Sequence, residues 1–418
     1  NAALYHLARR TPSINNRFIA GFIMKDYQKI LHELAANGSL RSLPHAVHQG
    51  KWIEQDGQRM LNLSSNDYLG LANDRDLRNE FLDWLRDSDC PLSSSSSRLL
   101  TGNFTEYEVL EQLLAETFGR EAALVFNSGY HANTGILPAL ADKQTLLVAD
   151  KLVHASIIDG LLLSGTSFLR YRHNDYEHLE QILQKETSRY EQVIVATESV
   201  FSMDGDVADL NRLVALKHNY PNVLLYVDEA HAIGVRGSRG LGVAEECGCL
   251  QDIDLLVGTF GKAMASMGAY LLCSQEIRTY LINTMRPLIF STALPPAQIA
   301  WTTFLFRRLP QMNVRRQHLA AISRKLAAAL QGHGGEISRS HIVPFIIGAN
   351  EDCVLTAEEL RRHGFYCLPV RPPTVPKGTS RIRFSLTADV TTEEMDALLA
   401  YIFENLEEKF GNTTGKTI

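Results

Sequence analysis

Val223-Leu-Leu-Tyr-Val-Asp-Glu-Ala-His231 and Leu255-Leu-Val-Gly-Thr-Phe-Gly-Lys262 are the two stretches that decide the fold. Each begins with a short apolar run and ends in polar or glycine residues, a pattern typical of a buried parallel strand. Two such strands end at the same edge of one sheet, which brings Asp228, His231 and Lys262 together. In open α/β sheets, ligands bind at that edge.

The three side chains expected at this edge match the needs of pyridoxal phosphate (PLP). That cofactor takes an acid for its ring nitrogen, a partner for its ring and a lysine for covalent attachment. A lone lysine after a strand is most often a solvated surface charge. The prediction of a PLP site therefore depends on the three groups occurring together.

Asp228-Glu-Ala-His231 also spells a motif of nucleotide-driven helicases. A helicase would require a phosphate loop of the form G-x-x-x-x-G-K-[ST]. Gly261-Lys262 is followed by Ala263, where Ser or Thr is needed, and Leu256 stands at the first glycine position. The spacing therefore excludes a nucleotide-driven motor.

The composition predicts an ordinary globular protein. The chain has 418 residues, 45% of them hydrophobic, and a formal net charge of -6. That charge argues against a nucleic-acid-binding surface, and no apolar stretch has the length of a membrane span. The six cysteines form no C-x-x-C pair and no histidine is spaced for zinc, so we expect no metal and a reduced, cytoplasmic location.

The first residues carry arginines before the first acidic residue, Asp26. Such a segment is compatible with a transit peptide. We favour another interpretation, in which residues 1–23 precede the protein's own start at Met24, because an amphipathic helix is expected to begin there.

From about residue 105 onward, helical and strand patterns alternate, as in a doubly wound sheet. A capping box, Thr105 to Glu108, opens a helix that Gly119 ends. The expected strands are 123–126, 145–149, 168–171, 193–197, 224–228, 255–259 and 270–273. These strands predict a seven-stranded, mostly parallel sheet with helices on both faces.

Beyond Pro295-Pro296 the pattern changes to a long helix over 314–330 and short strands around 343–347 and 381–386. Thr391 then caps a last helix that runs through Phe410. We therefore expect three parts: an N-terminal segment, 1–70; a large cofactor-binding domain, 71–305; and a smaller α+β domain, 306–418.

Eight motifs occur together in this chain and span most of it from residue 66 onward. The motifs are Asn66-Asp-Tyr-Leu-Gly-Leu71, Thr101-Gly102, Ser128-Gly-Tyr130, Asp150-Lys-Leu-Val-His-Ala-Ser156, Phe201-Ser-Met-Asp-Gly205, Asp228-Glu-Ala-His231, Thr259-Phe-Gly-Lys262 and Arg371-Pro-Pro-Thr-Val-Pro376. With these motifs the chain resembles the fold-type I PLP enzymes and, within them, the α-oxoamine synthases. The last motif, followed by Arg381-Ile-Arg383, is similar to the biotin-pathway branch of that family.

The resemblance implies a role for each residue near the cofactor ring. Lys262 would bind the cofactor covalently and then act as a base on the substrate. Asp228 would pair with the ring nitrogen, and His154 would stack on the ring. His231 and Ser202 would contact the phenolic oxygen. Ordinary alternatives stay open: a helix-capping Asp228, a His154 that only begins a helix, and a turn serine at 202.

The phosphate needs several donors at a helix N-terminus, which Ser128, Gly129 and Tyr130 supply, with a hydroxyl from Thr259. The resemblance adds Ser291 and Thr292 of a neighbouring subunit, which implies a homodimer with a shared active site. Arg371, with Thr374 beside it, is the candidate for the amino-acid carboxylate, because a guanidinium can hold a carboxylate in a bidentate pair. Arg41 and Arg98 are candidates for a carboxylate at the far end of the acyl chain.

The activity implied by the resemblance is a decarboxylative condensation. L-alanine would react through Cα with a pimeloyl thioester carried on coenzyme A or an acyl carrier protein. A glycine acyltransferase is the alternative within the family. From another class, a PLP-binding regulatory protein would have no need for the full set of Lys262, Asp228, His154 and His231.

Overall fold

The computed structural model describes residues 25–41 and 43–405. It divides into two units, 1–44 and 45–418, and each is described by itself. In the first unit, helix α1 (Tyr27–Ala36) begins after Asp26, whose carboxylate caps the helix by accepting a hydrogen bond from the Lys29 amide. The expected helix is therefore present, whereas Met24 and residues 1–23 lie outside the described residues.

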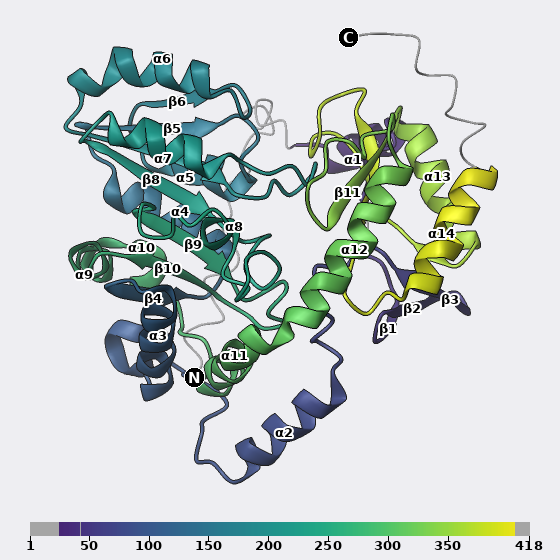
Figure 1. The fold of residues 1–418 in the computed structure, drawn as a ribbon, viewed down its shortest axis with the longest axis horizontal. Helices are drawn as coiled ribbons and strands as arrows, with labels where there is room; N and C mark the ends of the chain where they lie inside the picture. The colour runs from purple at the N-terminus through teal and green to yellow at the C-terminus, as the bar shows by residue number, and fades with distance from the viewer. Residues whose placement is uncertain (1–24, 42, 406–418) are drawn as a thin grey trace, which may run out of the picture. The chain divides into compact units, whose positions relative to one another are not determined.

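The centre of the second unit is a seven-stranded sheet with helices on both faces (Figure 1). Its strand order is β4-β10-β9-β8-β7-β5-β6, and β10 alone runs antiparallel to its neighbours. The predicted mostly parallel sheet is confirmed. Its strands are β4 (Ala122–Phe126), β5 (Thr145–Asp150), β6 (Phe168–Tyr171), β7 (Gln192–Glu198), β8 (Val223–Asp228), β9 (Leu255–Thr259) and β10 (Ala269–Cys273).

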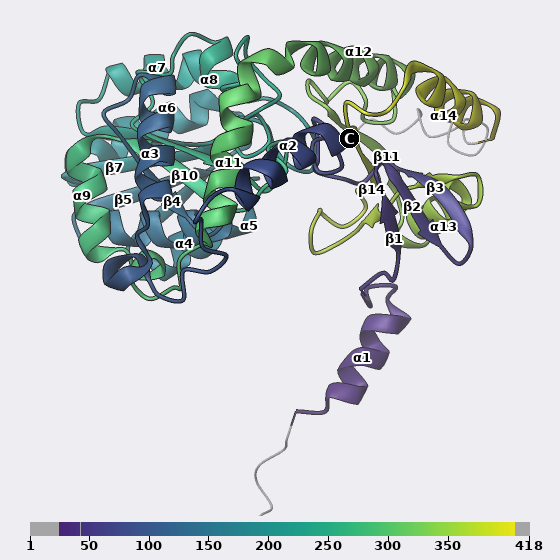
Figure 2. The same ribbon diagram turned by 90° about the horizontal axis from the view of Figure 1, so that it is seen from below.

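The central strands are apolar without alternation because helices cover both faces of the sheet. Every residue of β4, β5, β9 and β10 is buried. Among the helices, α4 packs against α5, α9 and α10, while α3 packs against α11 (Figure 2). The helices of this part are α2 (Arg75–Arg86), α3 (Thr105–Phe118), α4 (Gly129–Leu140), α5 (Ala155–Leu163), α6 (Tyr176–Glu186), α7 (Leu210–His218), α8 (Val243–Glu246), α9 (Gln275–Thr284), α10 (Arg286–Ile289) and α11 (Pro296–Arg308).

The rest of the second unit contains two smaller sheets. The first has the order β11-β14-β13, and the second has the order β1-β2-β3-β12. Strands near the start of the chain thus share a sheet with β12, since Leu61 of β3 pairs in parallel with Phe365. The limits predicted at residues 70 and 305 stay a prediction. The strands are β1 (Val47–Gln49), β2 (Trp52–Gln55), β3 (Gln58–Asn62), β11 (Ile342–Gly348), β12 (Phe365–Tyr366), β13 (Pro369–Val370) and β14 (Ser380–Ser385), and the helices are α12 (Asn313–Ala329), α13 (Asn350–Arg362) and α14 (Thr392–Asn405).

The helix caps agree with the sequence at two of three positions. Thr391 and Glu394 form the expected capping box of α14, and Gly119 ends α3 with a φ of 62°. The expected box at Thr105 is wrong. Thr105 is the first helical residue and Phe104 takes the capping position, without a side-chain hydrogen bond. The predicted end of the last helix at Phe410 lies outside the described residues.

Across residues 25–41 and 43–405, no helix combines the length and the apolarity that crossing a membrane requires.

Candidate active site at the carboxyl edge of the sheet

A cavity of about 160 Å³ opens at the carboxyl ends of the central strands. The parallel strands place their last residues, and the loops after them, around one space. Glu198 ends β7, Asp228 ends β8 and Thr259 ends β9. Seven of the residues predicted from the sequence line this cavity: Gly129, Tyr130, His154, Asp228, His231, Thr259 and Lys262.

Lys262 is the end of a chain of hydrogen bonds. Its Nζ lies 2.7 Å from His231 Nε2, and His231 Nδ1 lies 2.7 Å from the Tyr68 hydroxyl. Tyr68 donates its single proton to Asn66 Oδ1. His231 Nδ1 must therefore donate to Tyr68, which leaves the Nε2 lone pair to accept from Lys262. This series of hydrogen bonds fixes the tautomer of His231 and the orientation of the Lys262 side chain.

The pKa values of these two groups suit proton exchange. Burial lowers the pKa of Lys262 to about 8, against the opposing charges of Asp228 and Glu198. Burial, followed by the charge of Lys262, holds the pKa of His231 well below its usual range. Near neutrality His231 is therefore uncharged, and Lys262 can gain or lose a proton.

Asp228 is held by two hydrogen bonds. Its Oδ2 accepts from Asn133 Nδ2 at 2.8 Å, and its Oδ1 accepts from the Ala230 amide at 2.9 Å. Asn133 is fixed in turn, since Tyr226 donates to its Oδ1 and its Nδ2 also reaches Ser156 Oγ at 2.9 Å. Only one orientation of the Asn133 amide satisfies both contacts. The carboxylate therefore has a fixed direction.

His154 stands in front of α5, where its Nδ1 accepts from the Ser156 amide and lies 2.7 Å from Ser156 Oγ. His154 therefore caps the start of α5, which is the alternative that the sequence left open, and its imidazole also lines the cavity. Burial lowers the pKa of His154, although the charge of Asp228 opposes this. The ring is neutral near pH 7 and can lie against a flat partner.

The N-terminus of α4 points its first amides at the cavity through Gly129 and Tyr130. The first amides of a helix have no acceptor within it and attract anions. The hydroxyls of the two other phosphate candidates differ. Ser128 Oγ accepts from the His131 amide, which leaves its own proton available to an anion, whereas Thr259 Oγ1 donates its proton to the Gly268 carbonyl. At this edge the donors for an anion are the first amides of α4 and the Ser128 hydroxyl.

The remaining predicted residues do not line this cavity. Ser202 is buried, and its carbonyl accepts from Arg383 Nε at 2.5 Å. The Thr292 carbonyl accepts from Asn127, and Ser291 lines a different, small pocket. Arg371 and Thr374 lie in the turn after β13, where the Thr374 amide donates to the Arg371 carbonyl. The roles of all five stay predictions.

The two arginines considered for the acyl chain differ in what the structure says of them. Arg41 is exposed and belongs to the unit 1–44, so its place relative to the cavity is not described, and its role stays a prediction. The Arg98 guanidinium is already bound by groups of the fold. Its Nη1 donates to Glu111 at 2.6 Å and to the Val125 carbonyl at 3.0 Å, and its Nε donates to Asn103.

Three residues of the site were given no role from the sequence: Asn133, Glu198 and Tyr68, although Tyr68 lies in the motif Asn66 to Leu71. Glu198 is 3% exposed, its Oε1 has no hydrogen-bond partner, and burial followed by the charge of Asp228 raises its pKa well above the usual range. Burial and the charge of Asp228 both favour its protonated form. A polar residue at the end of an apolar strand was the available signal, the same one that identified Asp228.

The chemistry of this donor set fits PLP. The Lys262 amine, with its lowered pKa, suits the aldehyde of PLP, and the anchored Asp228 carboxylate suits the ring nitrogen. The neutral His154 imidazole suits the face of the ring, and the first amides of α4 suit the phosphate. Gly129 favours the fit further. A Cβ built there would come no closer than 3.9 Å to Thr259, so the backbone beside the helix N-terminus is open to the cavity.

Comparisons with known proteins show the family of the chain. The pattern of the family Aminotransferase class I and II matches residues 58–402. An 8-amino-7-oxononanoate synthase from Haemophilus ducreyi is 59% identical over 386 residues, which cover 90% of this chain and 100% of the relative.

Two solved structures are similar in fold. A serine palmitoyltransferase from S. paucimobilis, solved with PLP and myriocin bound, is 28% identical with a TM-score of 0.83, covering 92% of this chain and 97% of its own. An 8-amino-7-oxononanoate synthase from Francisella tularensis is 26% identical with a TM-score of 0.69, covering 84% and 99%.

Proposed function

Because the chain belongs to the 8-amino-7-oxononanoate synthases within the class I and II aminotransferases, we propose that it joins L-alanine to a pimeloyl thioester. The Cα of alanine forms a bond to the thioester carbonyl carbon. The thiol leaves, carbon dioxide is lost and 8-amino-7-oxononanoate is the product. The relatives do not favour the glycine acyltransferase alternative, since the Haemophilus ducreyi relative, like one from Pasteurella multocida that is also 59% identical, is named for 8-amino-7-oxononanoate.

The observation that carries this proposal is the buried Lys262 amine, with its pKa lowered to about 8, in one cavity with Asp228 and His154. A binding protein has no need for an amine that exchanges protons near neutrality. A catalyst that must remove a proton from Cα and later return one does need it.

PLP, when bound, withdraws electrons from the bonds at the substrate's Cα. The residues of the chain supply the rest. Asp228 holds a negative charge in a fixed place, because Asn133 and the Ala230 amide anchor it, and it would pair with the ring nitrogen of the cofactor. Lys262 moves the proton at Cα with its Nζ, and His231 Nε2 accepts a hydrogen bond from that amine. His154 would hold the cofactor by stacking on its ring.

Substrate binding is assigned to residues outside this cavity. We propose that Arg371 pairs with the alanine carboxylate, with Thr374 beside it, and that Arg41 meets the far carboxylate of the pimeloyl chain. The Ser202 side chain contacts the phenolic oxygen of the cofactor. The Ser291 and Thr292 side chains of a second copy complete the phosphate site, so that the enzyme works as a homodimer. A cytoplasmic location accords with the free state of all six cysteines.

The test is a substrate comparison with purified, PLP-loaded protein. With L-alanine and pimeloyl-CoA, we expect release of free coenzyme A, release of carbon dioxide and a product with the mass of 8-amino-7-oxononanoate. Pimeloyl carried on acyl carrier protein, measured in parallel, identifies the preferred thiol. A higher kcat/KM for glycine with acetyl-CoA than for alanine with pimeloyl-CoA would show that the proposal is wrong.

A further inference from the structure

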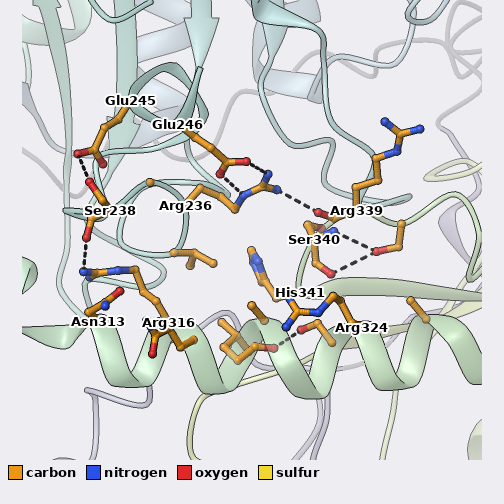
Figure 3. A pocket seen from close by; sticks show the side chains of 18 residues that line it. Arg236, Ser238, Glu245, Glu246, Asn313, Arg316, Arg324, Arg339, Ser340 and His341 are labelled. Carbon is orange, nitrogen blue, oxygen red and sulfur yellow. Dashed lines mark hydrogen bonds and ion pairs between the residues drawn. The ribbon is translucent and has the colours of Figure 1, made fainter. Parts of the chain in front are cut away.

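A second and larger cavity, of about 820 Å³, lies away from the catalytic one and shares none of its lining residues. It is bounded by α12, by the loop after β8 and by the segment that leads into β11 (Figure 3). Small-molecule sites in proteins usually measure about 300–1,000 Å³. The cavity is therefore large enough for an organic molecule.

The charges that line this cavity are unbalanced. Four arginines face two glutamates: Arg236, Arg316, Arg324, Arg339, Glu245 and Glu246. Both carboxylates are already in ion pairs, Glu246 with Arg236 at 2.6 Å and Glu245 with Arg239 at 2.8 Å. The cavity therefore has positive charge that its own carboxylates do not neutralise.

Arg316 is the clearest case, because it is only 4% exposed and has no carboxylate partner among the described residues. Its Nη atoms donate to the carbonyls of Leu309 at 2.8 Å and Ser238 at 2.9 Å, whereas its buried Nε has no partner. Burial lowers the pKa of Arg316, but a guanidinium remains charged at neutral pH. Glu245 acts on Arg316 through its charge but makes no direct ion pair with it, and it is already paired with Arg239, so an anion in this cavity would stabilise the buried guanidinium.

Arg324 adds a second positive charge from the same helix. It lies two turns after Arg316 on α12 and is exposed. Across residues 25–41 and 43–405 its guanidinium makes no hydrogen bond or ion pair. Figure 3 shows both arginines rising from α12, with Arg236, Ser340 and His341 near them. A ligand between these elements would meet guanidinium groups from the helix and from the loop.

His341 is an independent sign of a ligand. It is 2% exposed and lines the cavity, yet neither ring nitrogen has a hydrogen-bond partner. Its ring lies against Tyr68, with the ring centres 3.9 Å apart. Burial, followed by the charge of Arg383, holds its pKa well below the usual range, so the imidazole is neutral, with one donor and one acceptor nitrogen. Buried polar groups are normally satisfied, so this imidazole is an unpartnered polar group within the cavity wall, which a bound ligand reaches through a small shift of that wall.

We propose that this cavity binds a small organic anion that carries phosphate or carboxylate groups. Arg316 and Arg324 neutralise its charge, and His341 hydrogen-bonds it. The hydroxyl of Ser340, whose oxygen accepts from the Ile342 amide at 3.2 Å, has its proton available for the same ligand. The site goes beyond the proposed condensation and does not depend on it.

The first test is a binding measurement on the PLP-loaded protein by isothermal titration calorimetry at low ionic strength. Pyrophosphate and citrate are the two probes, so that the phosphate and carboxylate forms of the ligand are distinguished. We expect saturable binding of at least one probe, with affinity that falls as salt is added. Loading with PLP keeps the probes from the catalytic phosphate site. If neither probe binds, the proposal is wrong.

The second test uses variants of exposed residues with matched controls on the same helix. Arg324→Gln removes a charge from the cavity and Ala320→Trp fills it, whereas Lys325→Gln and Ala321→Trp change neighbouring exposed positions that do not line it. We expect the first pair to weaken probe binding by at least about tenfold and the second pair to change it less than about twofold. Equal effects in both pairs would overturn the assignment. Circular dichroism and unchanged condensation activity show that all four variants fold.

Discussion

Two clusters of charged groups lie at the carboxyl edge of the same sheet and shift the pKa of their central base in opposite directions. Burial lowers the pKa of Lys262 to about 8. His173, after β6, is also penalised by burial, but hydrogen bonds to Asp150 and Asp206 outweigh that penalty and raise its pKa to about 10. Burial acts to lower the pKa of both bases, yet the net shifts of the two pKa values are opposite.

The difference lies in the direct partner of each base. Lys262 Nζ touches a neutral imidazole, His231, and the nearby carboxylates act only through their charge. His173 bonds both of its nitrogens to carboxylates, Asp150 at 2.9 Å and Asp206 at 2.7 Å. A neutral acceptor permits proton exchange near neutrality, whereas a pair of carboxylates holds the proton. The first arrangement suits catalysis and the second suits structure.

The structural role of His173 concerns the turn that carries Ser202. His173 holds Asp206, and its ring meets Phe201 edge-on, with the ring centres 4.4 Å apart. The same turn is tied to β14, because Arg381 pairs with Asp204. The cluster thus fixes a loop that joins the large sheet to a smaller one.

The largest expected effect comes from removing the catalytic base. Lys262→Ala should lower the condensation rate by at least about 10³-fold, because proton transfer and covalent attachment are both lost. The measurement is release of coenzyme A from pimeloyl-CoA. The melting temperature should not fall, since the buried amine adds no salt bridge. Lys262→Arg keeps a positive charge, and activity near that of the wild type in this variant would contradict the assigned role.

The pKa of Lys262 can be measured directly in the protein freed of PLP. Only the uncharged amine reacts with an aldehyde, so labelling of Lys262 by pyridoxal and borohydride should rise about fifty-fold from pH 6 to pH 8 and then level off. An ordinary lysine would instead keep rising toward pH 10.5. Peptide mass spectrometry at each pH separates Lys262 from other lysines. A rate that still rises tenfold per pH unit above pH 9 would show that burial does not shift this amine.

His173 should affect stability rather than chemistry. A raised pKa favours folding below the unfolded value of 6.5, and that gain is lost as the pH rises through about 10. His173→Ala should therefore lower the free energy of unfolding by roughly 2–4 kcal/mol at pH 7 and by much less at pH 10. Urea unfolding at both pH values is the measurement.

The control for this change is His218→Ala, at an exposed histidine that lies 3.4 Å from Asp252. An exposed pair contributes at most about 1 kcal/mol. A loss at His173 that is the same at pH 7 and pH 10 would mean that packing, and not the two carboxylates, supplies the stability.

The sequence predicted the sheet and part of the site because both depend on local patterns. Most of the seven strands are apolar runs followed by polar residues, and the predicted bounds lie within one or two residues of those observed. Lys262 and Asp228 were found since each follows such a run. Glu198 was missed because the predicted strand 193–197 stopped one residue short of it, although Glu198 is the last residue of β7 and pairs with Asp228 of β8.

Other features depend on contacts that a local pattern does not contain. The pairing of Leu61 with Phe365 joins segments about 300 residues apart, and no local pattern near either residue predicts it. His173 is one residue of a loop until the fold brings Asp150 and Asp206 to it. Asn133 lies in the buried middle of α4, where a helical pattern predicts only packing.

Asn133 gives the smallest of the expected effects and the sharpest test of anchoring at the catalytic edge. Asn133→Ala removes the donor to Asp228 Oδ2 but leaves the carboxylate in place. Loss of a hydrogen bond to a charged group should weaken PLP binding by roughly tenfold or more, because Asp228 no longer has one fixed direction. Equilibrium dialysis of PLP against the variant gives the dissociation constant. The matched control is Asn222→Ala, whose amide donates to the carbonyls of Thr187 and Tyr190 away from the cavity. That variant should lose stability and keep its PLP affinity. If both variants bind PLP as the wild type does, the Ala230 amide alone suffices to hold Asp228.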